Sequence, residues 1–433
     1  MQHQTRNTAL ALTLALFAGG CGSYEFSNPL VTAEKPAATP AQPAKTSATA
    51  TKSTKTSTVN GWRSTSPAAL AAMERPEAGA NPATLPEPSA FTNTTAFSPK
   101  TDYPTTDHGV MIDAPEGLTQ VSFASDGADF DPTVSRDGKF IAFASTQHRP
   151  TADIYIKQIG SRAVTQITAD PGNDVMPAVS PDGSRVAFCS DRNGVWNIFV
   201  VTTAGGQPAQ LTAERTHDLH PTWSPDGKKM AFCRLGQMSG RWELWVLNTD
   251  QPSQAEFVGF GMFPQWSPVA STGKSGSDRI LFQRGRERGD RAFSLWTIDY
   301  KPGDASTPTE VVAVRGLATI NPCWSPDGNW IAYALVNPLD PAGAFRSDLF
   351  IASTDGAATV NLTSGRYANG MPCWAADNRV YFISDRNGAD NIWSLGTERA
   401  VAAAKSSAPV NSNNAHNTPK ATSEPTAAAP EQP

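Results

Sequence analysis

The sequence has few of the features on which several large classes of protein depend. Its 433 residues carry 35 Lys and Arg against 40 Asp and Glu, so the net charge of -5 lacks the basic excess that phosphate binding needs. Five cysteines without a Cys-x-x-Cys pair give no zinc-type pattern, and no Gly-x-Ser-x-Gly motif is present for a hydrolase nucleophile. Nucleic acid is therefore excluded as a partner, and we expect no cofactor.

The chain also lacks an apolar run long enough to cross a membrane. The N-terminal run Ala9 to Phe17 follows Arg6 and is far shorter than the roughly 20 residues of a spanning helix. Small residues follow this run and lead to Cys21, which is typical of a signal peptide covering residues 1–20.

Ala-Gly-Gly-Cys at this position resembles the bacterial lipoprotein signal, in which the cysteine becomes the lipid-modified first residue. The resemblance implies that Cys21 anchors the protein to a membrane. Because Gly22 and not an aspartate follows Cys21, the resemblance favours anchoring in the outer membrane over the inner one, with the protein on the periplasmic side of the cell envelope. An ordinary secretory signal followed by an unrelated cysteine is the alternative.

Two segments are too poor in large apolar residues to fold. Residues 21–116 are mostly Ala, Pro, Thr and Ser, and residues 401–433 have a similar composition. We expect the first to be a disordered tether and the second a disordered tail, which leaves residues 117–400 as the folded domain.

What the folded domain does contain is one unit repeated six times, a proline followed closely by Ser-Pro-Asp-Gly or a related sequence. The repeats are numbered here from their prolines, which are Pro132, Pro177, Pro221, Pro264, Pro322 and Pro372. Spacings of about 40 to 50 residues between short strands are typical of propeller blades.

Each repeat divides into four short strands joined by tight turns. The Asp-Gly pair predicts a hairpin after the innermost strand, and alternating apolar residues such as Arg185 to Cys189 follow as the second strand. The sixth repeat lacks an outer strand, whereas residues 118–122 have the outer-strand pattern but precede the first repeat. The sequence therefore predicts an all-β, six-bladed propeller of four-stranded antiparallel blades, closed by an N-terminal strand.

The Pro-x-Trp-Ser-Pro-Asp-Gly core and the Leu-Thr outer strand resemble the repeats of the TolB propeller family. The resemblance covers about residues 117–399, and the fourth repeat departs from it at Ser267-Pro268-Val269. It implies a propeller that docks an envelope protein, since the family binds a peptidoglycan-associated lipoprotein and colicin segments. The α/β domain that precedes the TolB propeller has no counterpart here, and TolB itself is not lipidated.

The residue before each repeat proline is expected at the mouth of a central channel. These residues alternate between polar and apolar and are Asp131, Met176, His220, Phe263, Asn321 and Met371. Asp129, Asp174 and Asp218 stand two residues before the first three of them and suggest an acidic arc that could meet a basic side chain of a partner. A cation is another possible occupant, but such aspartates more often bind local backbone amides, so no metal is predicted.

Three other groups of residues each allow two interpretations. Cys189, Cys233, Cys323 and Cys373 occupy matched positions, and we expect buried thiols instead of disulfides or a metal site. The basic loop of residues 284–291 is either a surface for an anionic partner or a solvated turn. The tryptophans of the innermost strands are expected in the core and not in a sugar-binding platform.

Two functions remain open at this point. The first is a non-enzymatic, monomeric envelope lipoprotein whose channel mouth binds a protein or peptide segment. The second is a propeller-hosted hydrolase or lyase that uses Asp131 and His220, although no recognisable catalytic motif supports it.

Overall fold

The computed structural model describes residues 110–111, 116–285, 293–337, 346–363 and 365–407. The predicted signal peptide, Cys21, most of the predicted tether and residues 286–292 of the basic loop lie outside these ranges. The chain divides into two units, and all the described residues belong to the unit formed by residues 1–32 and 101–433.

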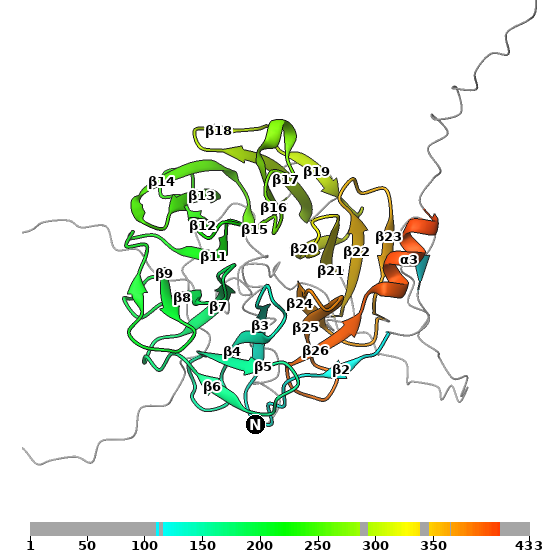
Figure 1. Ribbon diagram of the computed structural model, residues 1–433, viewed down its shortest axis with the longest axis horizontal. Helices are drawn as coiled ribbons and strands as arrows, with labels where there is room; N and C mark the ends of the chain where they lie inside the picture. The colour runs from blue at the N-terminus through cyan, green and yellow to red at the C-terminus, as the bar shows by residue number, and fades with distance from the viewer. Residues whose placement is uncertain (1–109, 112–115, 286–292, 338–345, 364, 408–433) are drawn as a thin grey trace, which may run out of the picture. The chain divides into compact units, whose positions relative to one another are not determined.

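Within this unit the chain is all-β, and each repeat begins with an innermost strand. These strands are β3 (Asp129–Val134), β7 (Asp174–Val179), β11 (Asp218–Trp223), β15 (Met262–Trp266), β20 (Ala318–Trp324) and β24 (Asn369–Trp374). Each innermost strand contacts the next along the chain, and β24 contacts β3, so the repeats follow one another around a common centre (Figure 1).

Two further strands pair antiparallel outward from each innermost strand. The second strands are β4 (Phe140–Ser145), β8 (Arg185–Ser190), β12 (Lys229–Leu235), β16 (Asp278–Gly285), β21 (Trp330–Val336) and β25 (Arg379–Ser384). The third strands are β5 (Asp153–Gln158), β9 (Asn197–Thr202), β13 (Trp242–Asn248), β17 (Phe293–Lys301), β22 (Ser347–Ser353) and β26 (Asn391–Gly396).

The outer strands vary more in length than the other three. They are β6 (Val164–Gln166), β10 (Ala209–Gln210), β14 (Gln251–Phe260), β19 (Thr309–Val312) and β23 (Thr359–Asn361). Repeat 4 also carries β18 (Asp304–Ala305), and a single parallel bridge between Phe293 and Ala318 joins its sheet to that of repeat 5.

The Asp-Gly turns form as the sequence predicts. In repeat 3, Gly227 has a φ of 69°, and the Asp226 carboxylate accepts hydrogen bonds from the Ser224 hydroxyl at 2.6 Å and the Lys228 backbone N–H at 3.1 Å. Repeat 6 makes the turn with Asn378, whose φ is 59°, in place of glycine, whereas repeat 4 contains an insertion with the short 3-10 helix η1 (Lys274–Gly276).

The core lies between neighbouring sheets. Each second strand buries at least one aromatic ring completely or nearly so, and the rings at matching positions are Phe143, Phe188, Phe232, Phe282, Tyr333 and Phe382. Trp223, Trp266, Trp324 and Trp374 are also buried, and the indole N–H groups of Trp223 and Trp324 donate to backbone carbonyls of the preceding repeat. These tryptophans therefore belong to the core, as predicted.

Residues before the first repeat lie against the last one. Strand β2 (Thr119–Gln120) pairs antiparallel with β26, and the backbone N–H of Val121 donates to Ile392 O at 2.8 Å. The Asn391 side chain binds both the N–H and the carbonyl of Ala124.

The predicted boundaries of the tether and tail need correction. Val110 and Met111 form strand β1, which pairs in parallel with β23, because the outer edge of that strand offers unpaired backbone groups. Residues 398–407 form helix α3 (Glu398–Ser407), which packs on β22 and β23 and buries Ala400 and Ala404. The alanines that suggested disorder are here the small side chains that let this helix approach the sheet.

Candidate functional site

The six residues that precede the repeat prolines share an unusual backbone conformation. None is glycine, yet all have φ values between 48° and 56°. At each of them the pairing register of the innermost strand shifts, which is the signature of a β-bulge. A left-handed conformation costs energy in non-glycine residues, and such strain gathers at functional sites.

These six residues stand at equivalent positions of innermost strands that contact one another in a cycle, and they are called here the central ring. The Asp131 carboxylate accepts a hydrogen bond of 3.0 Å from the Met176 backbone N–H in the next repeat. The His220 imidazole lies against the Phe263 ring, with 3.6 Å between their centroids. Contacts between neighbouring repeats therefore link members of the ring, as expected for residues around one opening.

The polar members of the central ring are poorly solvated. Burial raises the pKa of Asp131 to about 7, and the single hydrogen bond from Met176 opposes that shift only in part. Burial lowers the pKa of His220 to about 3, and its Nε2 atom has no hydrogen-bond partner among the described residues. His220 is therefore neutral near pH 7, whereas Asp131 changes its charge there.

Second-strand side chains support the ring from behind. The Gln283 side chain accepts a 2.9 Å hydrogen bond from the backbone N–H of Asn321, and the Cys189 thiol lies at the backbone N–H of His220. Cys189, Cys233, Cys323 and Cys373 are all free, and burial raises the pKa of each thiol. They pack as small side chains, as predicted, and are too deeply protonated to act as nucleophiles.

The predicted acidic arc is not presented at the surface. Asp129, Asp174 and Asp218 are completely buried. Arg192 binds both oxygens of Asp174 and Arg234 binds both oxygens of Asp218, while Asp129 accepts from the Gln147 amide. The interpretation as an exposed arc is wrong, because these strand-starting carboxylates turn back onto partners in their own sheets. Asp131 alone of the four is partly exposed.

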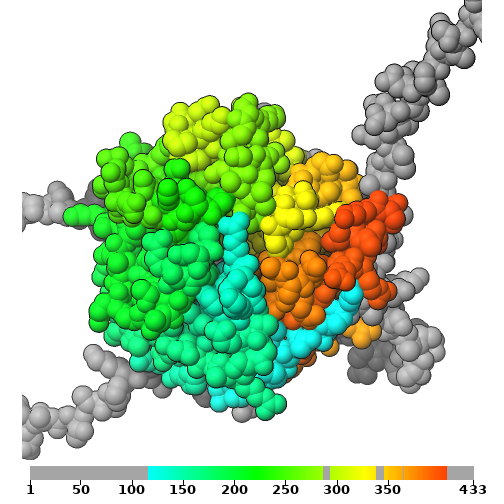
Figure 2. Space-filling model, in the orientation of Figure 1, coloured from blue at the N-terminus to red at the C-terminus, as the bar shows by residue number. Residues whose placement is uncertain are grey.

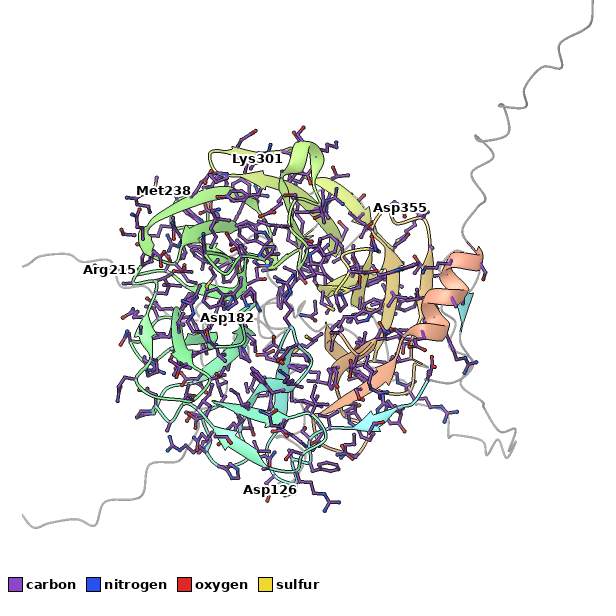
Figure 3. The ribbon with its side chains drawn as sticks, in the orientation of Figure 1. Asp126, Asp182, Arg215, Met238, Lys301 and Asp355 are labelled. Carbon is purple, nitrogen blue, oxygen red and sulfur yellow. The ribbon has the colours of Figure 1, made fainter. Side chains whose placement is uncertain are left out.

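The other end of the opening is crossed by an arginine. Arg136, in the turn after β3, donates to the carbonyls of Pro225 in repeat 3 at 3.2 Å and Pro268 in repeat 4 at 2.7 Å. Figure 2 shows the cyan segment of repeat 1 reaching the centre of the face in view, and Figure 3 places Asp182, in the turn after β7, near that centre. Turns of repeats 1, 3 and 4 are therefore joined at this end.

A separate cleft, of about 210 Å³, lies beside repeat 1 and was not anticipated from the sequence. It is lined by residues that include Phe123, His148, Tyr155, Lys157, Arg162 and Val164. Phe123 is 65% exposed, and the Lys157 ammonium lies 5.5 Å from the centroid of its ring. No sequence pattern could have indicated this cleft, because residues that follow β2 and residues of β3, β4, β5 and β6 form it together.

The remaining predicted sites can be placed only in part. Cys21 and residues 286–292 lie outside the described residues. Within the described ranges, no three His, Cys, Asp or Glu side chains are grouped so as to hold a metal ion. None of the described helices is long and apolar enough to span a bilayer.

Four-stranded antiparallel sheets whose innermost strands contact one another in a cycle are the fold of a β-propeller protein. Residues 79–272 match the family model described as the TolB beta propeller domain. The resemblance to TolB-type repeats is thereby confirmed.

Several solved propellers resemble this chain at low identity. The putative TolB of Agrobacterium tumefaciens is 18% identical, with a TM-score of 0.46 and coverage of 62% of this chain and 90% of its own. TolB of Acinetobacter baumannii is 17% identical, with a TM-score of 0.43 and coverage of 61% and 65%. An oligogalacturonate lyase of Vibrio parahaemolyticus is 13% identical, with a TM-score of 0.44 and coverage of 65% and 94%. No curated protein matches this chain significantly.

Proposed function

We propose that the protein is a non-enzymatic binding module, a six-bladed propeller closed by β2 that docks a segment of an envelope protein at its central ring. The observation that carries this proposal is the left-handed backbone of six non-glycine residues at one level of the innermost strands. Backbone strain of this kind gathers at ligand-binding sites, and here it occurs at all six positions.

The chemistry of the ring suggests what such a segment carries. Met176 and Met371 are partly exposed, and methionine adapts its shape to varied apolar partners. Asp131 supplies a carboxylate that is desolvated in the free protein and would gain from a basic group of the partner. We therefore expect a segment with apolar side chains and at least one Lys or Arg.

Replacing Asp131 with Asn tests the docking proposal directly. The change keeps the hydrogen bond to Met176 but removes the charge, so a partner held by a central contact should bind about 30-fold more weakly, which corresponds to about 2 kcal/mol. The partner would be recovered from envelope fractions by crosslinking to the wild-type protein, and its affinity for both proteins would be measured by titration.

Asp137→Asn is the matched control, because Asp137 lies in the exposed turn after β3 and pairs only with Lys139 and Ser135. We expect the control to bind as the wild type does. Equal affinity of Asp131→Asn and wild type would contradict docking at the central ring.

The proposed location is the periplasmic side of the outer membrane, with Cys21 as the lipid-modified residue and the propeller a monomer. Supporting this are the short apolar run, the small residues ahead of Cys21 and Gly22 after it. Changing Cys21 to Ser should move the protein from the membrane to the soluble fraction on cell fractionation, since the acyl chains would be lost. A Cys21→Ser protein that stays with the membrane would refute the anchor.

A hydrolase or lyase is the second candidate, and the pKa of about 7 at Asp131 is the observation in its favour, because a general acid or base works best near the ambient pH. Against it, no hydrogen bond joins Asp131 to His220 in the described part of the chain, and His220 lies against Phe263. Binding is therefore the function that the geometry supports best.

A further inference from the structure

Repeats 2 and 6 contain the same five-residue turn, Ser-Asp-Arg-Asn-Gly, at residues 190–194 and 384–388. In both turns the arginine Nε donates to the hydroxyl of the leading serine, at 2.8 Å from Arg192 to Ser190 and 3.0 Å from Arg386 to Ser384. The two guanidinium groups are thus positioned alike, and each repeat serves as a reference for the other.

In repeat 2 the arginine is neutralised. Nη2 of Arg192 donates to both carboxylate oxygens of Asp174, at 2.9 and 3.0 Å, and Nη1 lies 3.7 Å from the Asp170 carboxylate. Two carboxylates therefore balance the charge of this cation within the folded chain.

In repeat 6 both carboxylates are missing. Asn369 occupies the position of Asp174, and its neutral amide oxygen accepts from Nη2 of Arg386 at 2.8 Å. Gly365 occupies the position of Asp170. Among the described residues Arg386 forms no ion pair within 4.0 Å, and its Nη1 donates no hydrogen bond. Burial lowers the pKa of Arg386, and the Tyr367 and Asp385 side chains oppose that shift only in part.

The surroundings of Arg386 are aromatic. Its guanidinium carbon lies 4.9 Å from the Trp393 ring, 5.2 Å from the Tyr367 ring and 5.3 Å from the Phe382 ring. Tyr367 is 39% exposed and Arg386 is itself partly exposed, so this group can be reached from solvent.

A second donor beside Arg386 also lacks an acceptor. The indole N–H of Trp393 is buried without a hydrogen-bond partner among the described residues. The matching indoles of repeats 3 and 4 are satisfied, since Trp245 donates to Glu243 at 3.0 Å and Trp296 to Ser294 at 2.8 Å. In repeat 6 the residue at that position is Asn391, whose side chain is engaged with Ala124.

We propose that Arg386, flanked by Tyr367, Phe382 and Trp393, is a binding site for a carboxylate group that an acidic side chain of a protein partner supplies. A carboxylate matches the planar guanidinium edge and replaces the countercharge that Asp170 and Asp174 give to Arg192. Asn369 begins β24, so the site lies at the strand-start end of repeat 6. The identification of a protein partner as the source of the carboxylate rests on the proposed function. The site itself does not, because it is defined by the contacts of Arg386 with Asn369 and the three aromatic rings.

A carboxylate fits better than a phosphate group. Asp385 precedes Arg386, and burial together with Asp385 raises the pKa of the nearby Asp390 to about 6. The Asp385 carboxylate, which acts electrostatically on Arg386, repels a dianion more strongly than a monoanion, while the exposed face of Tyr367 can pack on the apolar stem of an acidic side chain.

The test is a titration of the 15N-arginine-labelled full chain with sodium acetate, followed through the Nε–Hε signals in NMR spectra and matched with sodium chloride at equal ionic strength. We expect the Arg386 signal, assigned by its loss in Arg386→Lys, to shift along a saturable curve in acetate only. The Arg192 signal should not respond, because its carboxylates are already in place.

Asn369→Asp supplies the decisive variant, since it recreates the pair of repeat 2, although it removes the hydrogen bonds that the Asn369 amide donates to the Ser347 and Tyr367 carbonyls. Acetate binding to Arg386 should become at least about tenfold weaker in this variant, and an unchanged Arg192 signal checks that the fold is retained. The proposal would be overturned if the Arg386 signal showed no saturable shift in acetate, or if the Arg192 signal shifted equally. It would also be overturned if chloride shifted the Arg386 signal as much as acetate does, or if Asn369→Asp bound acetate as the wild type does. A stronger response to inorganic phosphate than to acetate would overturn the choice of a carboxylate.

Discussion

Deleting residues 1–125 should destabilise the folded domain by about 5 kcal/mol, because the last repeat loses its outer strand and the contacts that follow it. The Val121 and Ser122 N–H groups donate to Ile392 O, the Ser122 hydroxyl accepts from Ile392 N–H, and Asn391 holds both backbone groups of Ala124. Removal would leave a buried asparagine without partners and a free strand edge. A loss of this size is comparable with the whole stability of many domains, so aggregation is expected.

Deleting only residues 1–115 is the control for this prediction. That variant retains Glu116, whose carbonyl accepts from the Gly396 N–H at 2.7 Å, and all the contacts of β2. It should lose only the short pairing of β1 with β23. Thermal melting and urea titration of the two proteins would compare them, and similar stability of both would refute closure of the ring by β2.

Changing Asp131 to Asn should stabilise the protein at neutral pH even though it weakens partner binding. Between about pH 4 and pH 7 the folded state keeps a proton on Asp131 that the unfolded state has released, because the folded pKa is raised to about 7. The free energy of unfolding of the wild type therefore falls as pH rises through this window, and the penalty remains above it.

The difference in the free energy of unfolding between Asp131→Asn and wild type separates the effect of Asp131 from that of the other carboxyl groups whose pKa is raised. It should be near zero at pH 4 and reach between about 1 and 4 kcal/mol at pH 8, the upper value corresponding to three pKa units. Urea unfolding at several pH values measures it. A difference that does not change with pH would show that Asp131 is ordinarily solvated, and would remove the argument that this carboxylate is held ready for a cation.

Much of the fold was predictable because its information is local. The Asp-Gly pair requires a backbone that glycine adopts at little cost, as at Gly227, so each hairpin is fixed by its own sequence. The alternating apolar pattern of each second strand places an aromatic residue, such as Phe188, on the face that is buried. The pre-proline residues were found in the same way, since a bulge recurs at the same point of every repeat.

The state of the candidate site was not predictable, because it depends on partners from distant parts of the chain. Asp174 and Asp131 look equivalent in sequence as acids near a repeat proline, yet the first is paired with Arg192 and the second accepts only the Met176 N–H. The arginines could have been noticed from the repeated Ser-Asp-Arg-Asn-Gly turn. That Arg386 faces Asn369 instead of an aspartate becomes meaningful only when the sheet brings residues 17 positions apart together.

By itself, then, the sequence determined the repeating unit, its turns and the residues of the central ring, since hairpins and bulges follow from neighbouring residues along the chain. The tertiary structure alone decided which charged groups are satisfied and which are not. The physical reason is that the free energy of a buried charge is set by its nearest partners and its solvation, and both are fixed only when strands from different parts of the chain pack together.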